Sequence, residues 1–149
     1  MGEALALADQ AAREGEVPVG AVVVQCQGEP RILGRGYNQR EALQDPTAHA
    51  ELSAIRQAAR ELGTWRLSGC RIYVTLEPCP MCAGAIVLSR LDACLYGCRD
   101  PKAGFVGTLG DLSAHPGLNH RFAVVSGVRE EECRARLQSF FRALRADRR

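Results

Sequence analysis

The sequence predicts an α/β domain in which helices cover both faces of a mixed β-sheet. Two observations favour this class: helical and strand-like segments alternate along the 149 residues, and two strand-like runs near the start are close enough to form a hairpin. No repeat, low-complexity tract or linker divides the chain. About 150 residues is the length of one ordinary domain, so we expect a single domain over residues 1–149.

The N-terminal part of the chain predicts one short helix followed by a hairpin. Residues 3–14 place apolar side chains at helical spacing. Residues 17–26 (VPVGAVVVQC) form the continuous β-branched, apolar run of a buried strand. Residues 31–38 form a second strand-like run after a short turn, and the two runs should pair.

The segment 45–63 carries the clearest helix signals. Asp45 is a candidate N-cap, Pro46 suits the first helical position, and Gly63 is a typical stop. An apolar stripe at intervals of three and four residues should face the sheet. Its members are Ala48, Leu52, Ile55, Ala59 and Leu62.

Two further strands with a helix between them are predicted next. Residues 70–78 and 92–98 have strand composition, and Pro78 ends the first of these runs. Residues 80–90 are apolar on nearly every side, which predicts a helix buried between layers.

The C-terminal third begins with a long connection. Residues 99–120 are rich in glycine and proline, and a connection of this length inside one domain is usually functional or locally structured. Residues 121–128 predict a last strand. Residues 129–146 predict an amphipathic helix, with an inward face of Cys133, Leu137, Phe140 and Leu144.

Composition excludes several classes of protein. No apolar run reaches the roughly 18 residues that span a bilayer, and the start lacks the basic end and apolar block of a signal peptide, so we expect a cytoplasmic protein. Seven cysteines, an odd number, favour metal binding or catalysis over a disulfide framework. The arginine-rich C-terminal end could contact a phosphate backbone or could be a solvated helix face.

His49, Cys79 and Cys82 form a candidate metal site. A catalytic zinc ion has three protein ligands and an open position for water, whereas structural zinc has four ligands. Pro80 predicts that Cys79 caps a helix with Cys82 at its third position, where the helix N-terminus stabilises thiolates. No second C-x-x-C is present to make a structural zinc site.

Glu51 lies two residues after His49. On an ideal helix the two side chains would be about 200° apart, so the spacing permits convergence without showing it. Beside a zinc-activated water, a carboxylate can take up a proton and pass it to a substrate. We therefore predict that Glu51 is a proton shuttle and not a ligand.

H-x-E followed by P-C-x-x-C is the signature of zinc-dependent deaminases. Beyond this signature, the sequence resembles the bacterial tRNA-specific adenosine deaminase family along most of its length. The segments that carry the resemblance are 16–24, Asn38, 45–51 (DPTAHAE), 75–90 (TLEPCPMCAGAIVLSR), 100–104 (DPKAG), 115–121 (HPGLNHR) and 139–142 (SFFR).

The resemblance implies a three-layer αβα sandwich with a mixed sheet of about five strands, assembled as a homodimer with one zinc ion per subunit. It implies that hydroxide attacks C6 of a flipped-out adenine while Glu51 moves the protons. Adenosine would become inosine at the wobble position of a tRNA anticodon stem-loop, typically that of an arginine tRNA. The zinc ligands would be His49, Cys79 and Cys82.

The resemblance also implies substrate-binding residues. Asn38 would hydrogen-bond the target nucleotide, and the backbone around Ala50 would lie against the base. Surface side chains would contact the anticodon stem-loop, although Lys102 and Arg121 could simply be solvated. These side chains are Lys102, His115, Asn119, Arg121, Phe141 and Arg142.

Two other functions use the same fold. A deaminase of free guanine or of another base or nucleoside shares the zinc signature, and the 115–121 loop and 139–142 tail favour tRNA over it. Free-cytidine deaminases usually have cysteine where this chain has His49. An inactive RNA-binding partner subunit would have lost the glutamate, and Glu51 is present.

Overall fold

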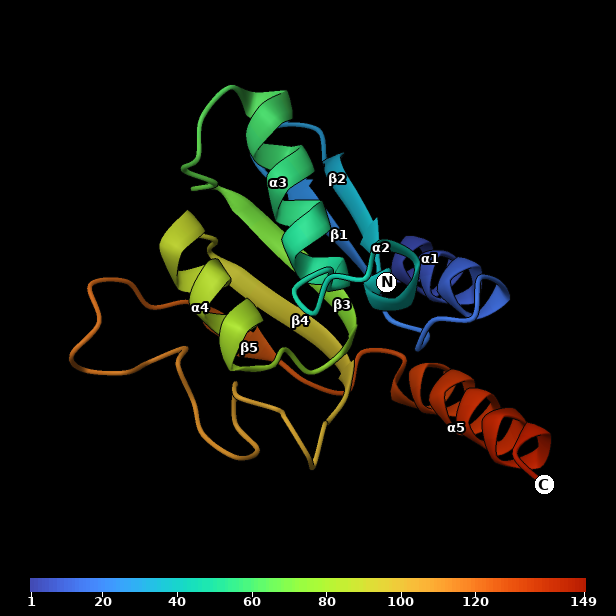
Figure 1. Ribbon diagram of the computed structural model, residues 1–149. Coiled ribbons are helices and arrows are strands. Elements are labelled where there is room, and N and C mark those ends of the chain that lie inside the picture. The colour runs from blue at the N-terminus through green and yellow to red at the C-terminus, as the bar shows by residue number, and fades with distance from the viewer.

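A five-stranded mixed sheet forms the centre of the computed structural model, which describes residues 1–149 (Figure 1). The strands lie in the order β2-β1-β3-β4-β5. Their bounds are Gly20–Gln25 for β1, Arg31–Tyr37 for β2, Cys70–Leu76 for β3, Ala93–Cys98 for β4 and Ala123–Val125 for β5.

The sheet combines an antiparallel half with a parallel half. β1 pairs antiparallel with both β2 and β3, so β1 and β2 form the predicted hairpin. β3, β4 and β5 run parallel. Parallel strands need crossover connections, and here helix α4 (Pro80–Ser89) joins β3 to β4. The predicted α/β class with a mixed sheet is confirmed.

Helices cover both faces of this sheet (Figure 1). α1 (Gly2–Arg13) and α5 (Glu130–Asp147) contact each other and the strands on one face. α3 (Ala50–Leu62) and α4 contact each other on the opposite face. A short helix, α2 (Arg40–Leu43), precedes α3. The three-layer αβα sandwich is therefore confirmed, and its main core lies around β1, β3 and β4.

Helix α3 begins four residues later than the sequence predicts, at Ala50 instead of Pro46. The carboxylate of Asp45 accepts hydrogen bonds from the Thr47 amide (2.8 Å) and the Thr47 hydroxyl (2.7 Å), so it closes a turn instead of capping a helix. His49 is the N-cap, in an extended conformation. Gly63 ends the helix in the left-handed conformation (φ 70°), as predicted.

The predicted apolar stripe of this helix is only partly confirmed: Ala48 is buried and Ile55, Ala59 and Leu62 pack against the core, but none of the stripe residues within the helix is fully buried. The fully buried positions of α3 are Ala50, Glu51, Ala54 and Ala58, whereas Leu52 is only half-buried. The reason is how closely the helix approaches β2. Gly34 and Gly36 face the backbone of α3 at Ala50, Ala54 and Ala58, with no room for a side chain of their own.

Four smaller differences concern burial and length. β5 has only three residues, and β1 begins at Gly20. Helix α4 is not buried on all sides, because Leu88 is 70% exposed. The last turns of α5 extend away from the sheet (Figure 1), so only Cys133 of its predicted inward face is fully buried.

Two expectations drawn from composition can be compared with the structure. None of the seven cysteines forms a disulfide. No helix has both the length and the apolar composition required to cross a bilayer.

Replacing Gly36 with alanine should destabilise the protein strongly. A Cβ atom there would collide with the Ala50 carbonyl and lie 2.8 Å from both the Ala54 amide nitrogen and the Ser53 Cβ. Because backbone atoms must move, we expect the free energy of unfolding to fall by about 3 kcal/mol in urea titrations. Arg35→Ala, on the exposed side of the same strand, should cost under about 1 kcal/mol. Equal losses for the two variants would contradict this account.

Candidate metal centre and substrate pocket

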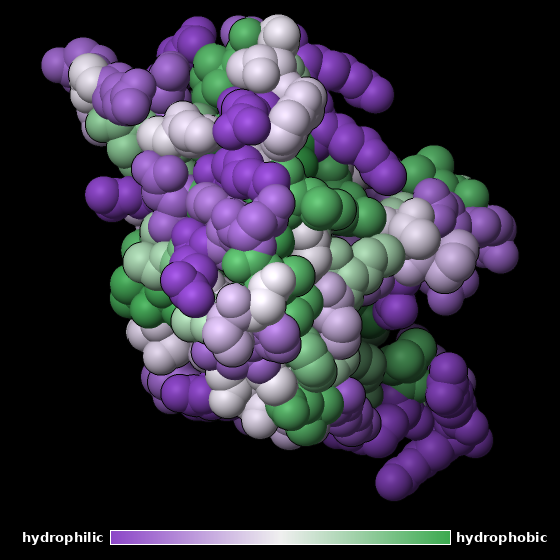
Figure 2. Space-filling model, turned by 90° about the vertical axis from the view of Figure 1, so that its left-hand side faces the viewer, coloured by the Kyte–Doolittle hydropathy of each residue, from purple (hydrophilic) through white to green (hydrophobic).

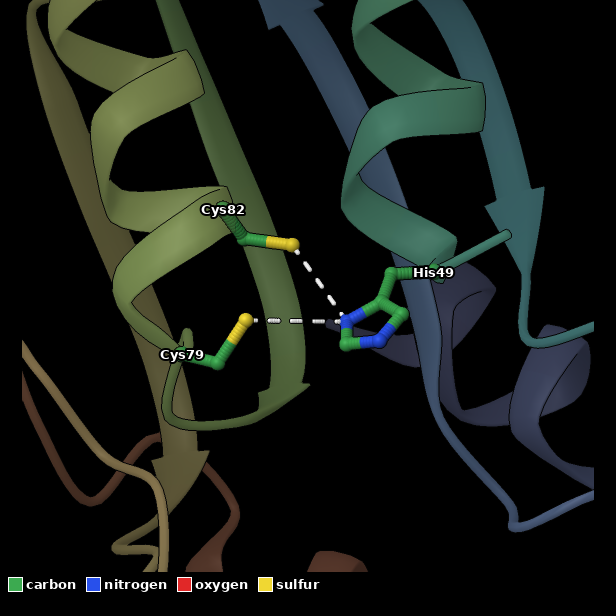
Figure 3. Close-up of side chains that lie close together, drawn as sticks. All are labelled: His49, Cys79 and Cys82. Atoms are coloured by element: carbon green, nitrogen blue, oxygen red, sulfur yellow. Dashed lines mark hydrogen bonds between the residues drawn. The ribbon is translucent and has the colours of Figure 1, made fainter. Parts of the chain in front are cut away.

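The three predicted ligands come from the first residues of two neighbouring helices. His49 is the N-cap of α3, and Cys79 is the N-cap of α4. Pro80 occupies the first turn of α4, and Cys82 is its third residue, as the sequence predicts. Figure 3 shows both cysteine side chains pointing toward the His49 ring across the gap between the helices.

The distances in this cluster suit a zinc ion. Nδ1 of His49 lies 3.7 Å from Cys79 Sγ and 3.5 Å from Cys82 Sγ. All three ligand atoms lie within 4.8 Å of one another. With Zn–S near 2.3 Å and Zn–N near 2.05 Å, a tetrahedral site requires a nitrogen–sulfur separation of about 3.6 Å. The donor set and its spacing therefore fit zinc.

The electrostatics of the cluster also favour a cation. The Cys82 side chain beside Cys79, together with His49, lowers the pKa of Cys79 to about 4, so Cys79 is a thiolate at neutral pH. The hydrogen bond with Cys79 raises the pKa of His49. Cys82 is fully buried, and the neighbouring Cys79 and this burial raise its pKa. A bound metal ion deprotonates a coordinating thiol outright.

Glu51 reaches the same site from the first turn of α3. It is 4% exposed, and this burial raises the pKa of its carboxyl group. The separation of about 200° between His49 and Glu51 on an ideal helix does not apply. His49 has extended backbone angles (φ −84°, ψ 150°) and precedes the helix. This bend in the chain lets both side chains face one pocket.

That pocket has a volume of about 400 Å³, the size of a small-molecule site. Asn38 is buried in its wall, where its side-chain amide donates to the Val17 carbonyl (3.4 Å). Of the residues predicted from sequence, the pocket is lined by Asn38, His49, Ala50, Glu51, Cys79, Lys102 and Phe141.

Four predicted substrate contacts lie outside this pocket. His115, Asn119 and Arg121 are exposed on the long loop, and Arg142 is exposed on α5. The Nδ1 of His115 accepts a hydrogen bond from the Gly117 amide (3.0 Å), which shapes a local turn. These residues could contact only parts of a substrate that extend beyond the pocket.

Sequence reasoning missed four charged residues of the pocket: Arg40, Glu77, Arg99 and Asp100. Arg99 follows β4 and Glu77 follows β3, at the carboxyl ends of parallel strands. Ligands bind preferentially at this edge in α/β folds, so strand topology would have indicated both residues. Arg40 comes two residues after Asn38, and no pattern around it marked it for binding.

Comparison with known proteins identifies the family. Residues 1–98 match the model described as the cytidine and deoxycytidylate deaminase zinc-binding region. The chain belongs to this deaminase family. Within it, the chain is 53% identical to the tRNA-specific adenosine deaminase of Bacillus subtilis over 145 residues, which cover 97% of this chain and 88% of that protein.

Two further similarities concern tRNA-modifying proteins. A solved structure from work on A-to-I editing by tRNA:A34 deaminases aligns with a TM-score of 0.86 and 42% identity, covering 92% of this chain and 97% of that one. The chain is also 51% identical to part of a tRNA(Ile)-lysidine synthase of Deinococcus deserti, covering 97% of this chain but only 27% of that longer protein. Membership of the family predicted from the sequence is confirmed.

Proposed function

We propose that this protein hydrolyses adenosine to inosine at the wobble position of a tRNA anticodon, with an arginine tRNA as the expected substrate, in the cytoplasm. The observation that carries the proposal is one pocket lined by His49 and Cys79 of the metal cluster and by the buried Glu51. The similarity to tRNA-specific adenosine deaminases supports adenosine as the base and tRNA as its carrier.

In this proposal His49, Cys79 and Cys82 hold one zinc ion per chain. A zinc ion in such a site supplies a nucleophilic water at neutral pH. Glu51 is the general acid–base group that transfers the protons. Burial raises the pKa of its carboxyl group above the ordinary value, which is the direction that suits a general acid–base group at neutral pH. Glu51 takes one proton from the attacking water and passes it to the adenine ring. It then takes the remaining proton of that oxygen, now bonded to C6, and gives it to the amine, so the C6–N bond breaks, water is consumed and ammonia is released.

The pocket walls position the base. Asn38 is held by the Val17 carbonyl and offers its amide to the target nucleotide, while the start of α3 at Ala50 lies against the base. The base must leave the stacked anticodon loop to enter, because a 400 Å³ pocket admits one nucleotide and not a stem-loop.

The rim of the pocket favours a polynucleotide over a free base. Arg40, Arg99 and Lys102 line it, are exposed, and form no ion pair with a carboxylate. Three free cations around one opening suit the phosphates on either side of a flipped nucleotide. A free purine carries no charge for them to meet.

We also propose that the protein is a homodimer. The apolar residue Leu88 is largely exposed on α4, and the face that bears α4 shows several hydrophobic patches among polar ones (Figure 2). A second subunit would cover such surface and add contacts to the anticodon arm. Sedimentation equilibrium should give twice the mass of the chain, and a monomer across micromolar concentrations would contradict this part.

The deciding experiment is deamination of an arginine anticodon stem-loop with adenosine at the wobble position. We expect inosine there and nowhere else. A matched stem-loop with the adenosine moved by one nucleotide should remain unchanged. Ammonia from free guanine or free cytidine, without inosine in the stem-loop, would replace the proposal with a base or nucleoside deaminase. Zinc binding without any product would indicate an RNA-binding subunit.

A further inference from the structure

Glu77 is a buried carboxylate that the chemistry described above does not use. It directly follows β3, two residues before Cys79, and is 2% exposed. No cation pairs with it. It accepts instead the backbone amides of Asp100 (3.2 Å), Val106 (3.1 Å) and Thr108 (3.1 Å), and the Thr108 hydroxyl.

These hydrogen bonds hold the first part of the long loop, residues 100–108. The donors span residues 100–108, so one carboxylate ties together three points of a segment that has no strand or helix. The loop packs directly on the carboxylate, because any side chain at Gly104 would collide with it. The Phe105 amide also donates to the Pro78 carbonyl (2.9 Å), so the loop is fixed to the residue that precedes Cys79.

The same loop is a wall of the substrate pocket. Residues 99–103 line the opening, and Arg99 and Lys102 are two of its three free cations. The backbone of Lys102 is held by Asp100, whose carboxylate accepts the Lys102 amide (2.9 Å) and the Ala103 amide (3.2 Å). Asp100 is in turn held by Glu77 through its own amide. A chain of bonds thus runs from Glu77 to the rim.

We infer that Glu77 is a positioning residue for the polynucleotide: it holds residues 99–103 so that Arg99 and Lys102 meet phosphates beside the target adenosine. This inference rests on the proposed function. Glu77 acts through the loop and does not touch the reacting atoms. Hydrogen bonds to a buried carboxylate are stronger than those to a neutral acceptor. Replacing this carboxylate should therefore loosen residues 99–103 and leave the metal cluster in place.

The test is Glu77→Gln, assayed on the anticodon stem-loop. Glutamine has nearly the same shape as glutamate, but its NH2 group is a donor and cannot accept hydrogen bonds from the backbone amides. We expect KM to rise about tenfold with kcat within about threefold, because the loosened wall weakens binding and leaves the chemical step in place. Zinc content should be unchanged. The slope of log(kcat/KM) against log[salt] should become shallower by about one for each phosphate that the rim cations no longer neutralise.

Two variants separate this role from general destabilisation. Asp92→Asn makes the same chemical change, from carboxylate to amide, away from the pocket. The Asp92 carboxylate accepts the loop amide of Gly69 (3.1 Å). This variant should leave KM and the salt slope unaltered. Thr108→Val removes one donor to Glu77 and leaves the carboxylate in place, so it should shift KM and the slope in the same direction by less. It also serves as the test if Glu77→Gln does not fold.

The outcomes distinguish this inference from the proposed function. No inosine from the wild-type protein would overturn the proposed function itself. Active wild type with an unchanged salt slope in both Glu77→Gln and Thr108→Val would overturn the positioning role alone. A parallel loss of kcat and zinc in these variants would also overturn it, since Glu77 would then support the metal cluster and not the rim.

Discussion

Glu51→Gln should lower kcat for inosine formation by about 10³-fold, within the 10²–10⁴ range of general acid–base catalysis. The amide has nearly the same shape but cannot take up and release a proton. Zinc should stay bound, because Glu51 is not in the His49, Cys79 and Cys82 cluster. Single-turnover rates on the stem-loop together with zinc analysis measure both effects.

The stability of this variant should move in the opposite direction from its activity. Burial raises the pKa of Glu51 in the folded protein, so keeping it ionised at neutral pH costs folding free energy. Glutamine removes that cost, and the unfolding midpoint should stay the same or rise. Glu61→Gln, on the exposed side of the same helix, should change neither rate nor zinc. A variant that lost stability and activity together would assign Glu51 a structural role.

The metal cluster could be predicted from sequence because its geometry is largely local. Cys79 and Cys82 are placed by one helix start, and Pro80 marks that start. The N-terminus of α3 was misplaced because Asp45 and Pro46 are equally good signals for a turn, and the Asp45 carboxylate is used by Thr47. Local sequence preference does not decide whether an aspartate caps a helix or closes a turn.

The shape of the long loop could not be predicted in the same way. Glu77 and its donors are separated by 23 to 31 residues, and no spacing rule connects them. The sequence indicated only that such a connection should be structured or functional. The predicted burial of α5 was wrong for a related reason: its apolar spacing is real, but only Cys133 is fully buried, Leu137 is partly packed beside it, and the last turns extend away from the sheet.

Cys82→Ser should abolish both zinc binding and deamination. A serine hydroxyl at this buried position would supply neither thiolate charge nor a sulfur ligand, and two remaining ligands, His49 and Cys79, do not make a catalytic zinc site. We expect one zinc ion per chain in the wild type and none in the variant, measured by metal analysis after dialysis. Inosine formation should fall to background.

Cys70→Ser provides the matched control for this loss. Cys70 is as fully buried as Cys82, but it lies in β3 outside the cluster, and burial raises the pKa of its thiol, so it stays neutral. Both substitutions bury a hydroxyl and should lower the free energy of unfolding by about 1–3 kcal/mol. Only Cys82→Ser should also lose the stabilisation that added zinc gives the wild type. If Cys82→Ser still bound one zinc ion per chain, Cys82 would not be a ligand and the proposed metal site would be wrong.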